Sequence, residues 1–264
     1  MNYDPEYCRG VCRRRTWLLR HMLGEREIRD PHDTIQALRK TQFIGESNHL
    51  SHGDYPILAL NLYELGIDFT AITGRENVFI PYLRKVFEKF GPIKIPIKDS
   101  ETNGLNKTEL RAIDDAIRRK MSEGRNIHNF AEGGRMYDSR LGEFEKVISH
   151  FAVKAAKDLK LDVLVSPQLF WWEPSQIERP YFLTLERWKH RWHNLPYVGI
   201  DLFAFGKAYI EGLFSLPERK VIHVFGRTFP IRECKNGAEL RDRVREEIVS
   251  LAKEHAPQLL RPSE

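Results

Sequence analysis

Short apolar runs alternate with helix-like hydrophobic patterns along most of this 264-residue chain. The apolar runs are strand candidates at 42–45, 68–73, 92–97, 126–131, 162–170 and 220–225. Between them, apolar residues recur at helical spacing, at Leu83, Val86, Phe87 and Phe90, at Leu110, Ile113, Ile117 and Met121, and at Leu240, Val244, Ile248 and Leu251. Strands that alternate with helices pack as a sheet covered by helices, so the sequence predicts an α/β fold.

The first 40 residues precede this alternation and are predicted to be a short basic helical appendage to one α/β domain that spans residues 41–264. Arginines and apolar residues interleave there as in an amphipathic helix, at Arg13, Arg14, Arg15, Trp17, Leu18, Leu19, Arg20, Met22 and Leu23. Such a helix either lies on an anionic membrane surface or packs on the domain. Packing is favoured, because most amphipathic helices turn their apolar side to a protein core.

The charge and hydropathy of the chain limit its location and its partners. A net charge of +5 and a pI near 9.0 favour phosphate-bearing substrates, an acidic carrier protein or an anionic membrane surface. No nucleic-acid motif accompanies this charge, so no nucleic-acid partner is expected. No apolar run approaches the roughly 18 residues of a spanning helix, and the N-terminus has no signal-peptide pattern. We therefore expect a cytoplasmic protein, soluble or peripheral on the cytoplasmic face of the membrane.

The stretch from Asn48 to Pro56 contains the first candidate site. It sets His49 five positions before Asp54, between an apolar run and an apolar helical pattern. A carboxylate beside an imidazole fixes its tautomer and stabilises its protonated form, as a general base acting on a hydroxyl requires. Two alternatives stay open: His52 as the base or as a substrate contact, and a metal site of His49, His52 and Asp54. The spacing departs from the H-x-H-x-D-H pattern of binuclear hydrolases, so no metal is expected.

A second candidate site follows the apolar end of the fourth strand candidate. It reads Glu132-Gly133-Gly134-Arg135. Two glycines let the backbone approach a phosphate closely, and a guanidinium such as that of Arg135 can bind a phosphate through two parallel hydrogen bonds. Arg140 adds a second cation. Without the first motif, the same stretch is also typical of a tight turn beside surface arginines.

Together, the two stretches resemble the motifs of the glycerolipid acyltransferase superfamily, over roughly residues 42–230. The first fits N-H-x-S-x-x-D, which contains the H-x4-D motif of these enzymes, and the second resembles their F-P-E-G-T-R block. Two details favour the glycerol-3-phosphate branch, which often reads H-R-S-H-x-D-Y and E-G-G-R-S-R-T-G-R-L. The matching residues are His49, Ser51, His52, Asp54 and Tyr55, then Glu132 to Arg135 with Arg140-Leu141. Asn48 is more like the lysophosphatidate branch.

Three positions depart from the family pattern. Ala131 stands where the family usually has proline, and Met136 stands where it often has serine. Lys98 takes the place of the arginine in the family's I-x-R block, in a stretch that matches this block poorly. Lysine supplies a point charge rather than a bidentate fork, so a phosphate contact there would be less specific.

The resemblance implies a mixed sheet covered by helices and the transfer of a fatty acyl group in phospholipid biosynthesis. The implied donor is acyl-CoA or an acyl carrier protein, with no other cofactor, and the implied acceptor is glycerol 3-phosphate or, alternatively, 1-acylglycerol 3-phosphate. His49 and Asp54 would be catalytic. The implied substrate-binding residues are Ser51, His52, Lys98, Glu132, Gly133, Gly134, Arg135 and Arg140. Two other hypotheses are a binding protein that keeps the fold without turnover and a metal-dependent hydrolase.

Overall fold

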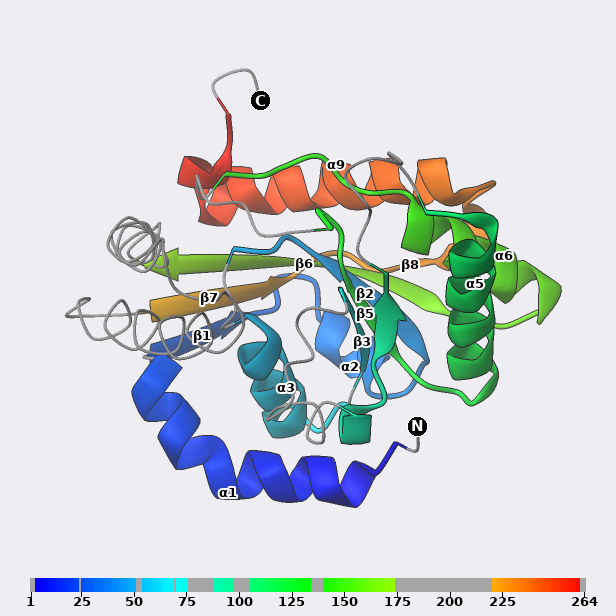
Figure 1. The fold of residues 1–264 in the computed structure, drawn as a ribbon. Helices are drawn as coiled ribbons and strands as arrows, with labels where there is room; N and C mark the ends of the chain where they lie inside the picture. Colours follow the sequence, from blue (N-terminus) through cyan, green and yellow to red (C-terminus); the bar gives the residue numbers. More distant parts are fainter. Residues whose placement is uncertain are drawn as a thin grey trace, which may run out of the picture.

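A computed structural model shows an α/β fold (Figure 1). The structure describes residues 3–23, 25–50, 54–68, 70–75, 88–96, 105–133, 140–173 and 220–261. Within these ranges the strands form an eight-stranded sheet in the order β1, β7, β6, β2, β5, β3, β4, with β8 paired to β6. Their bounds are β1 Glu25–Arg29, β2 Phe43–Ser47, β3 Ala71–Arg75, β4 Ile93–Ile95, β5 Ile127–Phe130, β6 Leu164–Glu173, β7 Lys220–Phe225 and β8 Phe229–Pro230.

The sheet is mixed, as predicted, and strand β6 is where its direction changes. Strand β2 pairs in parallel with both β5 and β6, β3 pairs in parallel with β4 and β5, and β1 pairs in parallel with β7. The β6–β7 and β6–β8 pairs are antiparallel. The β2–β6 register ends with Ser47 opposite Gln168, so the last residues of β6 extend past the carboxyl end of β2.

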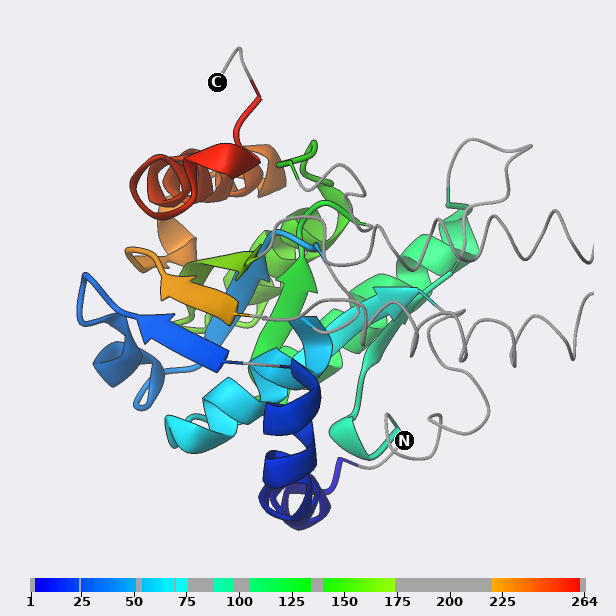
Figure 2. The same ribbon diagram turned by 90° about the vertical axis from the view of Figure 1, so that its left-hand side faces the viewer.

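Helices cover both faces of the sheet (Figures 1 and 2). One face is covered by α5 (Lys107–Ser122), α6 (Val147–Asp158) and α9 (Gly237–His255). Helix α6 lies between the other two and contacts both, and α9 packs on β6. Helix α3 (Asp54–Glu64) lies on the other face, and α1 (Pro5–Leu23) packs against α3. The short helices in the described part of the chain are α2 Thr34–Leu38, η2 Ile231–Glu233 and η3 Pro257–Leu259.

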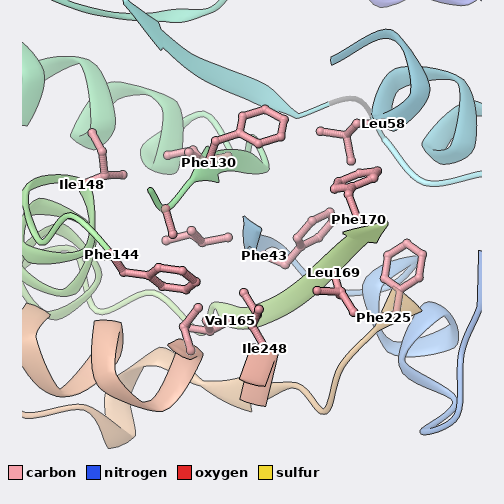
Figure 3. Close-up of a cluster of buried hydrophobic side chains, with 14 of the residues drawn as sticks. Phe43, Leu58, Phe130, Phe144, Ile148, Val165, Leu169, Phe170, Phe225 and Ile248 are labelled. Atoms are coloured by element: carbon pink, nitrogen blue, oxygen red, sulfur yellow. The ribbon is translucent and has the colours of Figure 1, made fainter. Parts of the chain in front are cut away.

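The hydrophobic core lies on both sides of the central strands. Figure 3 shows Val165 of β6 beside Ile248 of α9, and Phe170 of the same strand beside Leu58 of α3. The two β6 residues face opposite helix layers because side chains alternate along a strand. Phe43 of β2 is also fully buried. Each such side chain contributes about 1.5–3 kcal/mol through burial, so the central strands form a rigid base for the loops at their ends.

The structure confirms the main elements predicted from the sequence. All six strand candidates coincide with or overlap a strand, and the helical patterns at 110–121 and 240–251 lie in α5 and α9. Most of the pattern at 83–90 lies outside the described residues. Strands β1 and β8 were not predicted. Strand β1 reads Glu-Arg-Glu-Ile-Arg, which has no apolar run, and β8 has two residues.

The segment predicted as an appendage contributes to both the helices and the sheet. Helix α1 ends at Leu23, and β1 then pairs with β7 at the edge of the sheet. In its described first half, α1 buries Cys8 and Cys12 against a small cluster that includes Ala59 and Tyr63 of α3. This part of the helix therefore packs on the domain. Within the described residues, every helix is too short or too polar to cross a bilayer.

Candidate active site

The first candidate motif lies in the loop that joins β2 to α3, at the middle of the sheet. His49 follows the last residue of β2 by two positions, and Asp54 is the first residue of α3. In open α/β sheets, the loops at the carboxyl ends of parallel strands form the usual ligand site. A carboxylate in the first turn of a helix is also stabilised by the helix dipole. The motif thus lies where strand ends and a helix start meet.

His49 and Asp54 form a buried hydrogen-bonded pair. His49 Nδ1 lies 2.9 Å from Asp54 Oδ2, and the two residues are 5% and 0% exposed. The backbone N–H of Leu50 donates to the same carboxylate oxygen at 2.8 Å. The indole N–H of Trp172, at the end of β6, donates to Asp54 Oδ1 at 2.7 Å. An ionised carboxylate accepts from all three donors, which assigns the Nδ1 proton to His49 and leaves Nε2 as the nitrogen that can take up a proton.

Aromatic rings enclose the imidazole. The ring of Phe130 lies 4.4 Å from that of His49, and Tyr55 meets it edge-on at 5.1 Å. These contacts and the Asp54 hydrogen bond together fix the position of the imidazole ring. A proton acceptor held in this way needs little reorganisation when it acts.

Asn48 fixes the start of the loop to the neighbouring strand. Its side-chain amide donates to the carbonyl of Phe170 at 2.9 Å, and its side-chain oxygen accepts the Phe170 N–H at 2.7 Å. Both backbone groups of one β6 residue are thereby satisfied just past the end of β2. This anchoring role of Asn48 was not predicted, because its partner Phe170 is 122 positions away in the sequence.

Glu132, predicted as a substrate contact, is buried beneath the loop that carries His49. One carboxylate oxygen accepts the backbone N–H of His49 at 2.6 Å, and the other accepts the N–H of Gly142 at 2.7 Å. Hydrogen bonds to an ionised acceptor are stronger than neutral ones, so Glu132 holds two loops together. The adjacent Gly133 has φ 65°, and a Cβ there would meet Glu145 Cγ at 2.8 Å, which explains a glycine at this turn.

The structure brings part of the predicted site together. His49, Asp54 and Glu132 are joined by the contacts above, and Gly133 follows Glu132 directly in the chain. Arg140 is exposed, two positions before the Gly142 that Glu132 binds. The other predicted residues lie outside the described residues, namely Ser51, His52, Lys98, Gly134 and Arg135. His49 is therefore the histidine whose contact with Asp54 can be described.

A buried polar cluster under the site was not predicted as functional. Glu46 of β2 is 1% exposed and accepts hydrogen bonds from the Asn129 side chain at 2.7 Å and the Ser149 hydroxyl at 3.3 Å. Burial raises the pKa of the Glu46 carboxyl to about 7, and these two hydrogen bonds oppose the rise. In the layer facing α3, His128 contacts the Ser47 hydroxyl, and burial lowers its pKa to about 3, so it is neutral near pH 7. In the sequence, these buried positions could have been recognised as polar residues inside otherwise apolar strand candidates.

Glu46 makes the stability of the protein depend on pH. Between its usual value of 4.5 and about 7, the folded protein keeps the Glu46 proton and the unfolded chain releases it. The free energy of unfolding therefore falls as pH rises through this window, by about 3 kcal/mol at roughly 1.4 kcal/mol per unit. We expect the free energy of unfolding of Glu46→Gln, measured by urea titration, to equal that of the wild type near pH 4.5. Above pH 7 it should be higher than that of the wild type.

Glu143→Gln is the matched control, because this exposed glutamate precedes α6. It should leave the pH dependence of the free energy of unfolding unchanged. If Glu46→Gln and Glu143→Gln give the same difference from wild type at every pH, the Glu46 carboxyl does not carry this dependence.

Comparison with known families identifies the class of protein. A family model described as Acyltransferase matches residues 26–171, which is more than half of the chain and includes both candidate motifs. The protein therefore belongs to the acyltransferase family, within the glycerolipid acyltransferase superfamily, and it is an O-acyltransferase. The expectation drawn from the two motifs is confirmed at this level.

Among solved structures, the chain is similar to PlsC, the 1-acyl-sn-glycerophosphate (LPA) acyltransferase of Thermotoga maritima. The identity is 18%, the TM-score is 0.55, and the match covers 95% of this chain and 79% of that chain. At this identity the likeness concerns the fold, which confirms the α/β arrangement. The comparison with curated proteins gives no significant match.

Proposed function

We propose that the protein transfers a fatty acyl group from a thioester to the free hydroxyl of 1-acylglycerol 3-phosphate. The sequence motifs alone favoured glycerol 3-phosphate, which becomes the second candidate acceptor. Two observations support the change: Asn48 is more like the lysophosphatidate branch, and the similar Thermotoga maritima enzyme acts on 1-acyl-sn-glycerophosphate. The donor is acyl-CoA or an acyl carrier protein, and the reaction uses no other cofactor.

The buried His49–Asp54 pair in a chain of the acyltransferase family carries this proposal. His49 Nε2 takes the proton of the acceptor hydroxyl while the hydroxyl oxygen forms a bond to the thioester carbonyl carbon. The tetrahedral intermediate then collapses, the carbon–sulfur bond breaks, and the leaving thiolate takes the proton from His49. Asp54 stabilises the imidazolium between the two steps. The acyl group passes directly to the acceptor, without an acyl-enzyme.

The acceptor phosphate would bind beside this pair. We assign its contacts to Gly133, Gly134 and Arg135, with Arg140 as a second cation, because this block follows Glu132 on the loop tied to His49. Ser51, His52 and Lys98 are retained as further substrate contacts. Glu132 takes a different role from the one first expected: its backbone contacts place the loop, and its charge is directed at N–H groups rather than at a phosphate.

A donor-and-acceptor panel tests the proposal. The purified protein is incubated with acyl-CoA or acyl carrier protein donors and with 1-acylglycerol 3-phosphate, glycerol 3-phosphate or water as acceptor, and products are identified by mass spectrometry. Diacylated product from 1-acylglycerol 3-phosphate supports the proposal, and monoacylated product from glycerol 3-phosphate restores the second candidate. Thioester hydrolysis that EDTA abolishes and zinc restores points to the metal hydrolase, and binding without product points to the non-catalytic protein.

Arg135→Ala should raise the apparent KM for the acceptor far more than that for the donor. Losing a charge-assisted hydrogen bond costs about 1.5–3 kcal/mol, which corresponds to roughly a 10- to 100-fold change. Arg135→Lys should recover part of the loss, because it keeps the charge without the fork. Steady-state kinetics with each substrate varied in turn measure the KM for the acceptor and the KM for the donor.

Arg232→Ala is the control, since this exposed arginine lies in η2, which follows β8 near the amino-terminal end of β6. Its KM values should equal those of the wild type. Equal weakening of donor and acceptor by Arg135→Ala would instead indicate a structural arginine. A selective donor defect would assign the block to the phosphates of coenzyme A.

A further inference from the structure

A residue at the end of strand β6, Trp172, contacts the His49–Asp54 pair. Trp172 lies four positions beyond Gln168, the last β6 residue paired with β2, so it is level with the loop that carries His49. Antiparallel pairing with Val221 of β7 holds the backbone of Trp172 in place. Its side chain is 2% exposed and lies on the α3 side of the sheet, where Asp54 begins that helix.

Trp172 binds the second oxygen of the Asp54 carboxylate. The two residues are 118 positions apart in the sequence, and the indole Nε1 lies 2.7 Å from Oδ1. The other oxygen, Oδ2, already faces both His49 Nδ1 and the Leu50 N–H. The indole therefore binds the oxygen that His49 does not, and it fixes the rotation of the carboxylate about its Cβ–Cγ bond. A tryptophan N–H that is buried seeks such a partner, because it can only donate.

We propose that Trp172 is a positioning residue for the general base, holding the Asp54 carboxylate toward His49 and setting the pH range in which His49 accepts a proton. This inference rests on the proposed acyl transfer and adds a residue to it. The indole draws negative charge toward Oδ1. Without the indole, more of the charge stays on Oδ2, where it strengthens the hold on the imidazolium. The base then loses its proton only at higher pH.

The other groups around His49 contact it independently of the indole. Tyr55 of α3 meets the imidazole edge-on, and Phe130 of β5 packs against it. His128 of β5 is buried and neutral, and Glu132, just past the same strand, accepts the backbone N–H of His49. None of these contacts involves Trp172. A change in the pH profile of a Trp172 variant therefore reports on the Asp54 contact.

The neighbouring Trp171 supplies a matched control. It lies on the same strand and is 4% exposed, but alternation along the strand turns it away from Asp54. Trp172→Phe and Trp171→Phe remove the same atoms from adjacent buried positions. Both variants should lose stability, and Trp172→Phe alone removes a donor to the catalytic aspartate.

The first experiment compares the pH dependence of kcat/KM for wild type and both variants. Trp172→Phe should lower the plateau about tenfold, as loss of an outer hydrogen-bond partner commonly does. Its acid limb should move to higher pH by about half a unit to one unit. Trp171→Phe should keep the wild-type acid limb. A merely structural tryptophan lowers the active fraction equally at all pH values, so an unmoved limb in Trp172→Phe, or equal shifts in both variants, overturns the proposal.

A second experiment needs no turnover and no folded Trp172 variant. In ¹⁵N–¹H spectra of the full-length wild-type protein, the Trp172 indole N–H should exchange slowly with solvent, and Asp54→Asn should shift its resonance while leaving that of Trp171 in place. Failure to shift overturns the positioning role even in an active enzyme. The wild-type protein could instead show no acyl transfer while Asp54→Asn still shifts the Trp172 indole resonance. That result would reject the proposed function and keep the contact, so the two failures are distinguishable.

Discussion

Asp54→Asn is expected to lower kcat by about 10⁴-fold while the protein still folds. Within the described residues, the carboxylate accepts hydrogen bonds from His49, Leu50 and Trp172, and it has no exposed surface. An amide keeps one acceptor oxygen and presents a donor in place of the other. At least one of these donors must then face an N–H group, and the His49 ring loses the negative charge that stabilises its protonated form.

The measurement is kcat at saturating donor and acceptor, corrected for the folded fraction from circular dichroism. Asp115→Asn is the control, because this residue is exposed on α5, and it should be fully active. A folded Asp54→Asn protein whose kcat stays within about tenfold of wild type would show that the carboxylate does not support the base.

His49→Ala should lower turnover by about 100- to 10,000-fold, because it removes the general base. The fold should persist, since the ring contacts Phe130 and Tyr55 at the end of the sheet and is not part of the central core. Single-turnover assays with a labelled thioester measure the loss of acyl transfer, and thermal melts report the fold.

Variants of two other histidines serve as comparisons for His49→Ala. His150→Ala, on the exposed side of α6, should retain wild-type turnover. His52→Ala should be milder than His49→Ala. If His52→Ala alone is inactive, the base is His52 and the contact between His49 and Asp54 has another purpose.

Elements with a strong apolar pattern were predictable from the sequence. Strands β6 and β7 carry mostly apolar stretches because helices cover both faces of the sheet, whereas β2 and β5 combine apolar residues with buried polar ones. Strand β1 alternates charge instead, and it joins the sheet through its pairing with β7, which no local pattern reveals. Its charged side chains find partners within β1 and on its neighbours: Glu27 contacts Arg29 of the same strand and Lys220 of β7.

The contact between His49 and Asp54 was predictable because the two residues are five positions apart in one turn. The residues that orient the pair were not, because they come from distant parts of the chain. Glu132 reaches His49 across 83 positions, and Trp172 reaches Asp54 across 118. A glutamate beside two glycines predicted a ligand site. In the structure, the Glu132 carboxylate accepts hydrogen bonds from the backbone N–H groups of His49 and Gly142. The substrate contacts assigned to Arg135 and Lys98 stay predictions.

The position of β6 between a parallel and an antiparallel neighbour has a consequence for how the enzyme is made. During synthesis from the N-terminus, the dyad emerges early, but its loop lacks Trp172 until β6 has been translated and has docked beside β2. Strand β7, which holds that end of β6, comes later still. Contacts this remote in sequence form late in folding, since a long loop must close first. Competence for catalysis therefore arises only after β6 and β7 have been synthesised, long after its two central residues, His49 and Asp54.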